Sequence, residues 1–200
     1  MLKDQLKDYD IVLASASPRR KRLMEEMSID FRVKTKTIRE EYPSSLSPDE
    51  VAIHLSELKA SAFSSSELEP NILLITADTI VSVDDKILGK PISRKDAFDM
   101  LISLSGKEHE VITGVCLRTL SKIQSFCVST KVIFKTLSEE EIQYYITNYL
   151  PFDKAGAYGI QEWIGHVAIE KIEGSYFNVM GLPTHKLYEE LLNFASKTGE

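Results

Sequence analysis

The segment from Asn71 to Val83 contains the most apolar run of the chain, and it constrains the fold more than any other feature. It predicts one long or bent strand, which turns at residues 84–85 into a second, short strand. Asp78 and Thr79 lie in the middle of this apolar run. An ionised aspartate in such a strand is costly unless it meets a cation or a metal ion, which points to a functional role. The alternative is an aspartate at a strand end that caps a turn.

Strands and helices alternate along the rest of the chain. At 200 residues it has about the length of one domain, or of two small lobes that share a core. We expect a single domain over residues 1–200, with an α/β fold, a mixed sheet and helices on its faces, because an antiparallel hairpin interrupts the alternation. The other strands are expected over residues 11–15, 31–35, 109–120, 124–137 and 166–172. Helices are expected over residues 18–27, 47–65, 93–106 and 183–194, with one more starting at Ser138. Ser47 with Glu50, and Ser138 with Glu141, are predicted to cap the starts of two of these helices.

The composition excludes several classes of protein. With 43% hydrophobic and 27% charged residues, the chain can build a buried core, which excludes a disordered or collagen-like protein. Lys and Arg total 24 against 30 Asp and Glu, and the net charge of -6 disfavours binding to nucleic acid or to an anionic membrane. Cys116 and Cys127 are too few for a disulfide scaffold and lack the spacing of a zinc site. The N-terminal residues contain no apolar signal segment, so we expect a cytoplasmic protein.

The segment from Ser15 to Arg22 places four basic residues at the predicted start of a helix. Each cation costs a few tenths to about 1 kcal/mol there, because the helix dipole is positive at its N-terminus. Backbone N–H groups, the hydroxyl groups of Ser15 and Ser17 and a bidentate arginine would together bind the phosphates of a polyphosphate ligand. The alternative is a row of solvated cations on a helix face.

Acidic residues elsewhere in the sequence suggest a metal site. Glu40 and Glu41 follow the second predicted strand. Together with Asp78 they offer the oxygen ligands that Mg²⁺ and Mn²⁺ prefer.

Two lysines and one small-residue segment have both a functional and a structural interpretation. Residues 88–91 resemble part of a P-loop but fail its pattern, because positions 84 and 91 are Asp and Pro, so Lys90 either binds phosphate or is solvated. Lys59, judged by its position in the sequence alone, lies at the edge of an amphipathic helix. Residues 152–161 are rich in small residues, which allow a backbone to approach a ligand or simply form a structural turn.

Six motifs occur in this chain in the order in which they occur in one known family. With them the chain resembles the Maf family of nucleotide pyrophosphatases from Ile11 to about Phe194. A single motif would not identify the family, whereas six in order are very specific. The motifs are LASASPRR at 13–20, ADTIV at 77–81, LGKP at 88–91, LSGKEHEVITGV at 104–115, DKAGAYGIQ at 153–161 and GSYFNVMGLP at 174–183.

This resemblance implies an elongated mixed sheet with a cleft between two lobes, related to the inosine-triphosphate pyrophosphatases. It also implies hydrolysis of a nucleoside triphosphate to the monophosphate and pyrophosphate with a divalent cation, Mg²⁺ or Mn²⁺. Asp78 matches the family's proposed proton acceptor; because an aspartate with a pKa of about 3.9 is a weak base, a role as metal ligand or in orienting water stays open. Glu40 is favoured as the second metal ligand, with Glu41 open. Positions linked to substrate choice are Arg19, Thr79 and Gln161, and those of the polar cleft are Ser15, Arg20, Lys59, Lys90 and Lys154.

The segment that ends at Gln161 resembles the branch of the family that prefers dTTP and UTP. A glutamine amide offers a donor and an acceptor, which suit the N3–H and carbonyl edge of thymine or uracil. We therefore expect both nucleotides to be hydrolysed with an efficiency well above that for ATP and GTP. The alternatives are the branch that takes 7-methyl-GTP and, from another class of function, a division-related module that binds nucleic acid or a septum protein without hydrolysis. The resemblance also implies a homodimer as the oligomeric state.

Overall fold

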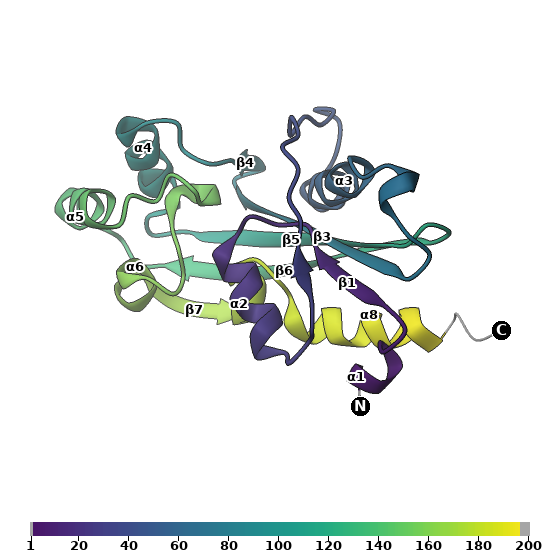
Figure 1. Cartoon of the computed structure of the whole chain (residues 1–200). Coiled ribbons are helices and arrows are strands. Elements are labelled where there is room, and N and C mark those ends of the chain that lie inside the picture. The colour runs from purple at the N-terminus through teal and green to yellow at the C-terminus, as the bar shows by residue number, and fades with distance from the viewer. Residues whose placement is uncertain (1, 197–200) are drawn as a thin grey trace. The chain divides into compact units, whose positions relative to one another are not determined.

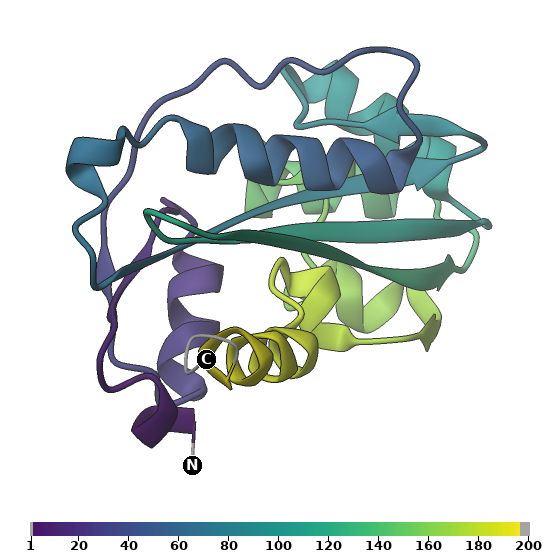
Figure 2. The same ribbon diagram turned by 90° about the vertical axis from the view of Figure 1, so that its right-hand side faces the viewer.

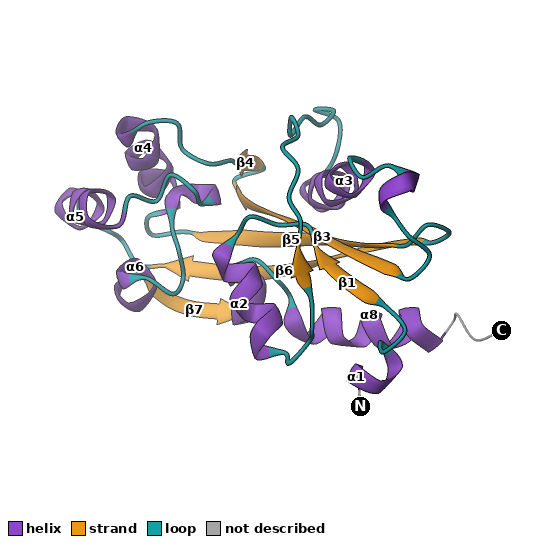
Figure 3. Cartoon of the chain, viewed as in Figure 1, coloured by secondary structure: helices purple, strands orange, loops and turns teal. Residues whose placement is uncertain are grey.

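The computed structural model describes residues 2–196 and shows a sheet flanked by helices (Figures 1 and 3). The strands are β1 Asp10–Leu13, β2 Arg32–Val33, β3 Ile72–Val83, β4 Lys86–Leu88, β5 Glu108–Arg118, β6 Ile123–Phe134 and β7 Ile169–Glu173. In this part of the chain they form one seven-stranded sheet in the order β2, β1, β3, β5, β6, β7, with β4 paired to β3 outside this row. β1 runs parallel to β2 and β3, whereas β4 is antiparallel to β3 and β7 to β6. The expected α/β fold with a mixed sheet is confirmed.

Several helices begin where the sequence supplies capping groups. Ser47 and Ser138 each form a capping box with the glutamate three residues later, as predicted. The helices are α1 Leu2–Gln5, α2 Pro18–Glu26, α3 Pro48–Ser61, α4 Arg94–Leu104, α5 Glu139–Tyr149, α6 Trp163–Val167, α7 Tyr176–Met180 and α8 Thr184–Ser196, with the 3₁₀ turns η1 Ser65–Glu67 and η2 Ala155–Ala157.

Several segments differ from the expectation. The helix predicted as far as Ser65 ends at Ser61, because Ser64 forms a capping box of its own and starts η1. The strand predicted from His166 starts at Ile169, because local helical hydrogen bonds form α6, among them one of 2.8 Å from Ala168 N–H to Ile164 C=O. The helices α1 and α7 were not predicted, since elements of four and five residues are too short to show a helical period.

The chain divides into two compact units. Unit 1 contains the residues up to Asp78, Thr113–Val128 and the residues from Gly181 onwards. Unit 2 contains Thr79–Ile112 and Ser129–Met180. That the chain acts as a single domain with a cleft between two lobes stays a prediction.

In unit 1, helices cover both faces of the strands. α3 lies on one face, and α2 and α8 lie on the other (Figures 1 and 2). The approach of α3 to β5 is very close at Gly114, where an added Cβ would lie 2.1 Å from the carbonyl oxygen of Ala52. Only a residue without a side chain fits there. The apolar layer beneath α3 contains Val12, Phe63, Leu68, Leu74 and Cys116.

In unit 2, α4, α5 and η2 pack together over an apolar core (Figure 1). Its main side chains are Leu101, Leu104, Phe134, Ile142 and Ile146. One buried polar pair lies in this core, with Nε2 of His109 2.8 Å from the hydroxyl oxygen of Tyr158. Burial lowers the pKa of His109 to about 4, so the ring is neutral at physiological pH. The pair fastens the small-residue segment that precedes Gln161 to β5.

Candidate functional site

Asp78 lies on β3 in unit 1, and its Oδ1 contacts the ammonium group of Lys59 from α3. The Asp78 side chain is 10% exposed and that of Lys59 is 17% exposed. The aspartate in the apolar strand therefore meets the cation that its burial requires. Lys59, which by pattern alone is only the edge of a helix, supplies that cation.

A neighbouring buried hydrogen bond explains why these two side chains meet. The hydroxyl group of Thr76 donates to the carbonyl oxygen of Ser56 at 2.6 Å, and both residues are fully buried. Thr76 and Asp78 share one face of β3, because side chains alternate along a strand. Ser56 lies one helical turn before Lys59. The bond thus sets the register of α3 on β3 that brings Lys59 to Asp78.

A second carboxylate approaches the same lysine. Oε1 of Glu40 lies 2.9 Å from the Lys59 ammonium nitrogen. Glu41 instead pairs with Arg39 at 2.7 Å, and both of those side chains are exposed. The structure therefore brings Glu40 to Asp78 and Lys59, and it directs Glu41 to a surface ion pair.

Ser15 and Arg20 lie at the start of α2 in the same unit. Ser17 caps the helix by accepting a hydrogen bond from the backbone N–H of Arg20 at 3.4 Å. The hydroxyl oxygen of Ser15 accepts bonds from Ser17 N–H at 3.2 Å and from Nη1 of Arg20 at 3.5 Å. Nε of Arg20 donates to the carbonyl oxygen of Gly181 at 2.7 Å, so this guanidinium is held in one orientation.

Arg20 interacts electrostatically with the carboxylates of Asp78 and Glu40. Burial lowers the pKa of its guanidinium group, and so does the charge of Arg19, whereas the charges of Asp78 and Glu40 raise it. Arg20 remains a cation, because an arginine guanidinium group is not deprotonated in proteins. We call Asp78, Lys59, Glu40 and Arg20 the Asp78 cluster. Arg19 lies beside it in the first turn of α2 and is half-buried.

The donor set of the Asp78 cluster fits a magnesium-type ion. Within residues 2–196 no group of three or more His, Cys, Asp or Glu side chains is arranged to hold a metal ion. Mg²⁺, however, is commonly bound by one or two carboxylates together with the phosphates of a substrate. Asp78 and Glu40 are two carboxylates that meet at one lysine, and such a set suits an ion that phosphate oxygens help to bind.

The two lysines of unit 2 that were predicted to belong to the polar cleft, Lys90 and Lys154, have different environments. Lys90 is exposed in the loop after β4, and this loop is joined to η2 by a 3.0 Å hydrogen bond from Gly156 N–H to Gly89 C=O. The ammonium group of Lys154 is buried between two carboxylates, 2.6 Å from Asp153 and 3.0 Å from Glu162. The charge of Lys154 is thus balanced within the protein.

Gln161 and Thr79, predicted to determine substrate choice, also lie in unit 2. Gln161 is half-buried, and its amide oxygen is buried without a hydrogen-bond partner among the residues that the structure describes. An unpartnered buried acceptor is unfavourable in the protein alone and is suited to a ligand that donates a hydrogen bond. Thr79 is half-buried in β3, directly after Asp78.

The sequence patterns do not reveal two residues near Gln161, Tyr145 and Glu162. Tyr145 on α5 donates its hydroxyl hydrogen to Glu162, and the same oxygen accepts the N–H of Gly159 at 3.0 Å. Tyr145 occupies an apolar position of its helix, so the pattern presents it as a core residue. A buried tyrosine hydroxyl needs a polar partner, and this is the signal that could have revealed the contact.

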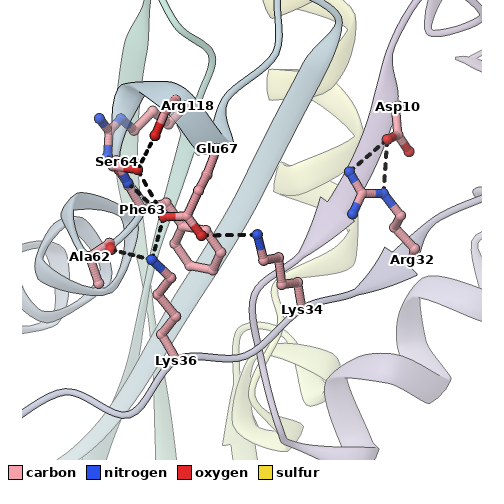
Figure 4. A network of polar contacts seen from close by, with 10 residues as sticks. Asp10, Arg32, Lys34, Lys36, Ala62, Phe63, Ser64, Glu67 and Arg118 are labelled. Carbon is pink, nitrogen blue, oxygen red and sulfur yellow. Dashed lines mark hydrogen bonds and ion pairs between the residues drawn. The ribbon is translucent and has the colours of Figure 1, made fainter.

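A second charged network lies in unit 1 around Glu67 (Figure 4). Lys34 and Lys36 approach its two carboxylate oxygens at 2.9 and 2.5 Å. The backbone N–H of Ser64 also donates to it at 3.1 Å. Lys36 in addition lies 4.9 Å from the ring centre of Phe63. We call Glu67, Lys34, Lys36 and Ser64 the Glu67 network.

Known proteins similar to this chain cover nearly its whole length. The family described as Maf-like protein matches residues 10–194. The chain belongs to the Maf family. A dTTP/UTP pyrophosphatase of Flavobacterium johnsoniae is 53% identical over 191 residues, covering 96% of this chain and 98% of that protein. Proteins of the same name from Porphyromonas gingivalis and Bacteroides fragilis are 51% and 55% identical, over 96% and 92% of this chain and 97% and 95% of their own.

One solved structure shows a similar fold at low sequence identity. A HAM1 protein from Coxiella burnetii matches with a TM-score of 0.51 at 10% identity, over 92% of this Maf-family chain and 99% of its own. This likeness concerns the fold alone, and it agrees with the mixed sheet and flanking helices. None of the helices within residues 2–196 has the length and apolar character needed to cross a membrane.

Proposed function

We propose that this Maf-family protein hydrolyses dTTP and UTP to the nucleoside monophosphate and pyrophosphate. The observation that carries the proposal is the Asp78 cluster, in which cations and carboxylates are gathered at a helix start and a buried strand. The relatives that are 51–55% identical over nearly their whole length carry the name of this activity, which supports the same substrates here.

In the proposed reaction, water attacks the α-phosphorus and the bond to the oxygen bridging to the β-phosphate breaks. Arg20 and Lys59 neutralise phosphate charge, and Arg19 and Lys90 are assigned the same task. Asp78 orients the attacking water or accepts its proton at Oδ2, since Oδ1 contacts Lys59. The pyrophosphate leaves with the electron pair of the broken bond.

We further propose that Asp78 and Glu40 hold a divalent cation, Mg²⁺ or Mn²⁺. Bound there, the ion would neutralise charge on the triphosphate and favour deprotonation of the attacking water. Lys59, which contacts both carboxylates, would then be available to the phosphates. The free thiols of Cys116 and Cys127 support a reducing compartment, and we place the protein in the cytoplasm.

Base recognition is assigned to unit 2. The buried amide oxygen of Gln161 would accept the N3–H of thymine or uracil, and its NH₂ group would donate to a ring carbonyl. A site that depends on such bonds rejects bases that leave its polar groups unpaired. Because thymine and uracil differ by one methyl group, both should be accepted. Thr79 is assigned to the same discrimination between bases. Replacing Gln161 by alanine should reduce the preference for dTTP and UTP over ATP and GTP.

A substrate panel tests this function. dTTP, UTP, CTP, ATP, GTP and 7-methyl-GTP are incubated with the protein and Mg²⁺ or Mn²⁺, and released pyrophosphate and phosphate are measured separately. The expected result is pyrophosphate release from dTTP and UTP at similar efficiency, well above ATP and GTP. A preference for 7-methyl-GTP would assign the protein to the other substrate branch. Absence of hydrolysis, together with salt-sensitive nucleic-acid binding, would instead favour the binding-module alternative.

A further inference from the structure

Gln161 lies in a tight turn of unit 2 whose ends are tied to each other. The backbone N–H of Glu162 donates to the carbonyl oxygen of Gly159 at 3.0 Å. A bond between the first and fourth residues defines a β-turn with Ile160 and Gln161 at its centre. We call residues 159–162 the Gln161 turn. The position of the Gln161 amide therefore depends on what holds the two ends of this turn.

Tyr145 holds both ends with one hydroxyl group. Its oxygen accepts the Gly159 N–H at 3.0 Å, and its hydrogen is donated to Oε2 of Glu162. Burial, together with the neighbouring Glu162 carboxylate, raises the pKa of Tyr145, so the hydroxyl group keeps the proton that it donates. The tyrosine ring is fully buried against the core of α4 and α5, which fixes the hydroxyl group in space.

Glu162 is held from its other side as well. Its Oε1 lies 3.0 Å from the buried ammonium group of Lys154. Each oxygen of this carboxylate therefore has its own partner, one from α5 and one from the segment before the turn. A carboxylate with both oxygens engaged by buried groups has little freedom to rotate, and it transmits that restriction to the adjacent Gln161.

Close packing removes the remaining freedom of the turn. A Cβ added at Gly159 would lie 3.0 Å from side-chain carbons of both Glu162 and Lys154. A Cβ added at Gly165 would lie 1.8 Å from the carbonyl oxygen of Ile160. Atoms therefore press on the turn from two sides, and a shift of its backbone would meet steric resistance.

We propose that Tyr145 and Glu162 are positioning residues that fix Gln161 for recognition of the pyrimidine base, without touching the substrate themselves. This inference rests on the proposed function. Hydrogen bonds to a base edge require donor and acceptor to be placed within about 0.5 Å. The Tyr145 hydroxyl group thus acts on substrate choice through the backbone at Gly159 and through Glu162.

The test is the ratio of kcat/KM for dTTP to that for dCTP, measured in the wild type and first in three variants. Tyr145→Phe removes one hydroxyl group and keeps the ring in the core. We expect it to lower the ratio about tenfold, the effect of losing one hydrogen bond of roughly 1.4 kcal/mol to the base. Gln161→Ala should lower the ratio to a similar extent, and the double variant should lower it no further than Gln161→Ala alone.

Two further variants serve as control and safeguard. Tyr149→Phe removes a hydroxyl group from the same helix, where the Tyr149 ring stacks on Tyr145 at 5.1 Å between ring centres, and should leave the ratio unchanged. If Tyr145→Phe fails to fold, as judged by thermal unfolding, Glu162→Gln replaces it, because it weakens both contacts of the carboxylate while keeping its shape.

The outcomes separate failure of this inference from failure of the proposed function. If the wild-type protein releases no pyrophosphate from dTTP, the proposed function is wrong and the inference falls with it. If the wild type is active and Gln161→Ala lowers the ratio while Tyr145→Phe does not, only the inference is wrong. It is also wrong if the effects of Tyr145→Phe and Gln161→Ala multiply in the double variant, because Tyr145 would then act independently of Gln161.

Discussion

Unit 1 contains two charged networks that use the same kinds of residue in opposite proportions. In the Glu67 network, two lysines and a backbone N–H converge on one carboxylate (Figure 4). In the Asp78 cluster, one lysine lies between two carboxylates. The oxygens of Glu67 are therefore met by two ammonium groups and an N–H, whereas in the cluster the carboxylates outnumber the lysine that lies between them. The first arrangement fastens a surface segment to η1, and the second brings together the two carboxylates that we propose to hold a divalent cation.

The comparison is tested most severely by Asp78→Asn. The amide keeps the shape of the side chain but is a poor metal ligand and cannot accept a proton at neutral pH, so kcat for dTTP should fall by about 10²- to 10⁴-fold. The variant should still fold cooperatively, because Lys59 keeps Glu40 as a partner. Glu67→Gln is the matched control and should keep wild-type turnover. Near wild-type turnover in Asp78→Asn would remove Asp78 from the mechanism.

Lysine replacement provides the next contrast. Lys59→Met should lower kcat/KM by about 10²-fold, because a buried cation at a site of phosphate charge is lost. Lys36→Met removes an equally charged side chain that is also paired with a glutamate, and it should leave kcat/KM unchanged. Steady-state kinetics at saturating Mg²⁺ measure both. Equal losses in the two variants would mean that charge in unit 1, rather than the Asp78 cluster, supports catalysis.

Arg19→Lys tests whether the planar shape of the Arg19 guanidinium group, next to the Asp78 cluster, contributes to activity. A planar guanidinium group can bind two oxygens at once, whereas an ammonium group acts as a point charge. We expect kcat/KM for dTTP to fall roughly tenfold, as for the loss of one charge-assisted hydrogen bond of about 1.5 kcal/mol. Unchanged kinetics would assign Arg19 to the solvated face of α2.

The smallest effect concerns the pH dependence of stability in the Glu67 network. Hydrogen bonds from Lys36, Lys34 and Ser64 hold the pKa of Glu67 well below its usual range. A carboxylate with a lowered pKa in the folded state stabilises the protein above its unfolded pKa of about 4.3, and this stabilisation is lost as the pH falls. The melting temperature of Glu67→Gln should lie below that of the wild type at pH 7, and the difference should shrink toward pH 3. A constant difference across this range would contradict the assignment.

The sequence predicted the parts of the molecule that depend on local rules. The capping boxes at Ser47 and Ser138 and the apolar strand around Asp78 follow from neighbouring residues, and the structure confirms them. Short elements such as α6 were not predicted, because five residues give too little periodicity to distinguish a helix from a strand.

The partners within the site depend on tertiary packing, which sequence patterns do not encode. A cation was expected for Asp78, but its origin in α3 depends on the register set between Thr76 and Ser56. The contact between Tyr145 and Glu162 joins residues that are 17 positions apart through a hydroxyl group that the apolar pattern conceals. The order of motifs identified the family, whereas the tertiary structure shows which side chains meet.

The absence of a side chain at Gly114 has a consequence for mutational tolerance. The atoms that a Cβ there would meet are the backbone atoms of Ala52 and Ile53, so no side-chain rotation could make room and α3 would have to move as a body. Lys59 lies two turns beyond Ala52 on the same side of that helix. A substitution at a position with no functional group would therefore draw Lys59 away from Asp78. In a scan of all substitutions, position 114 should be as sensitive for activity as the residues that perform the chemistry.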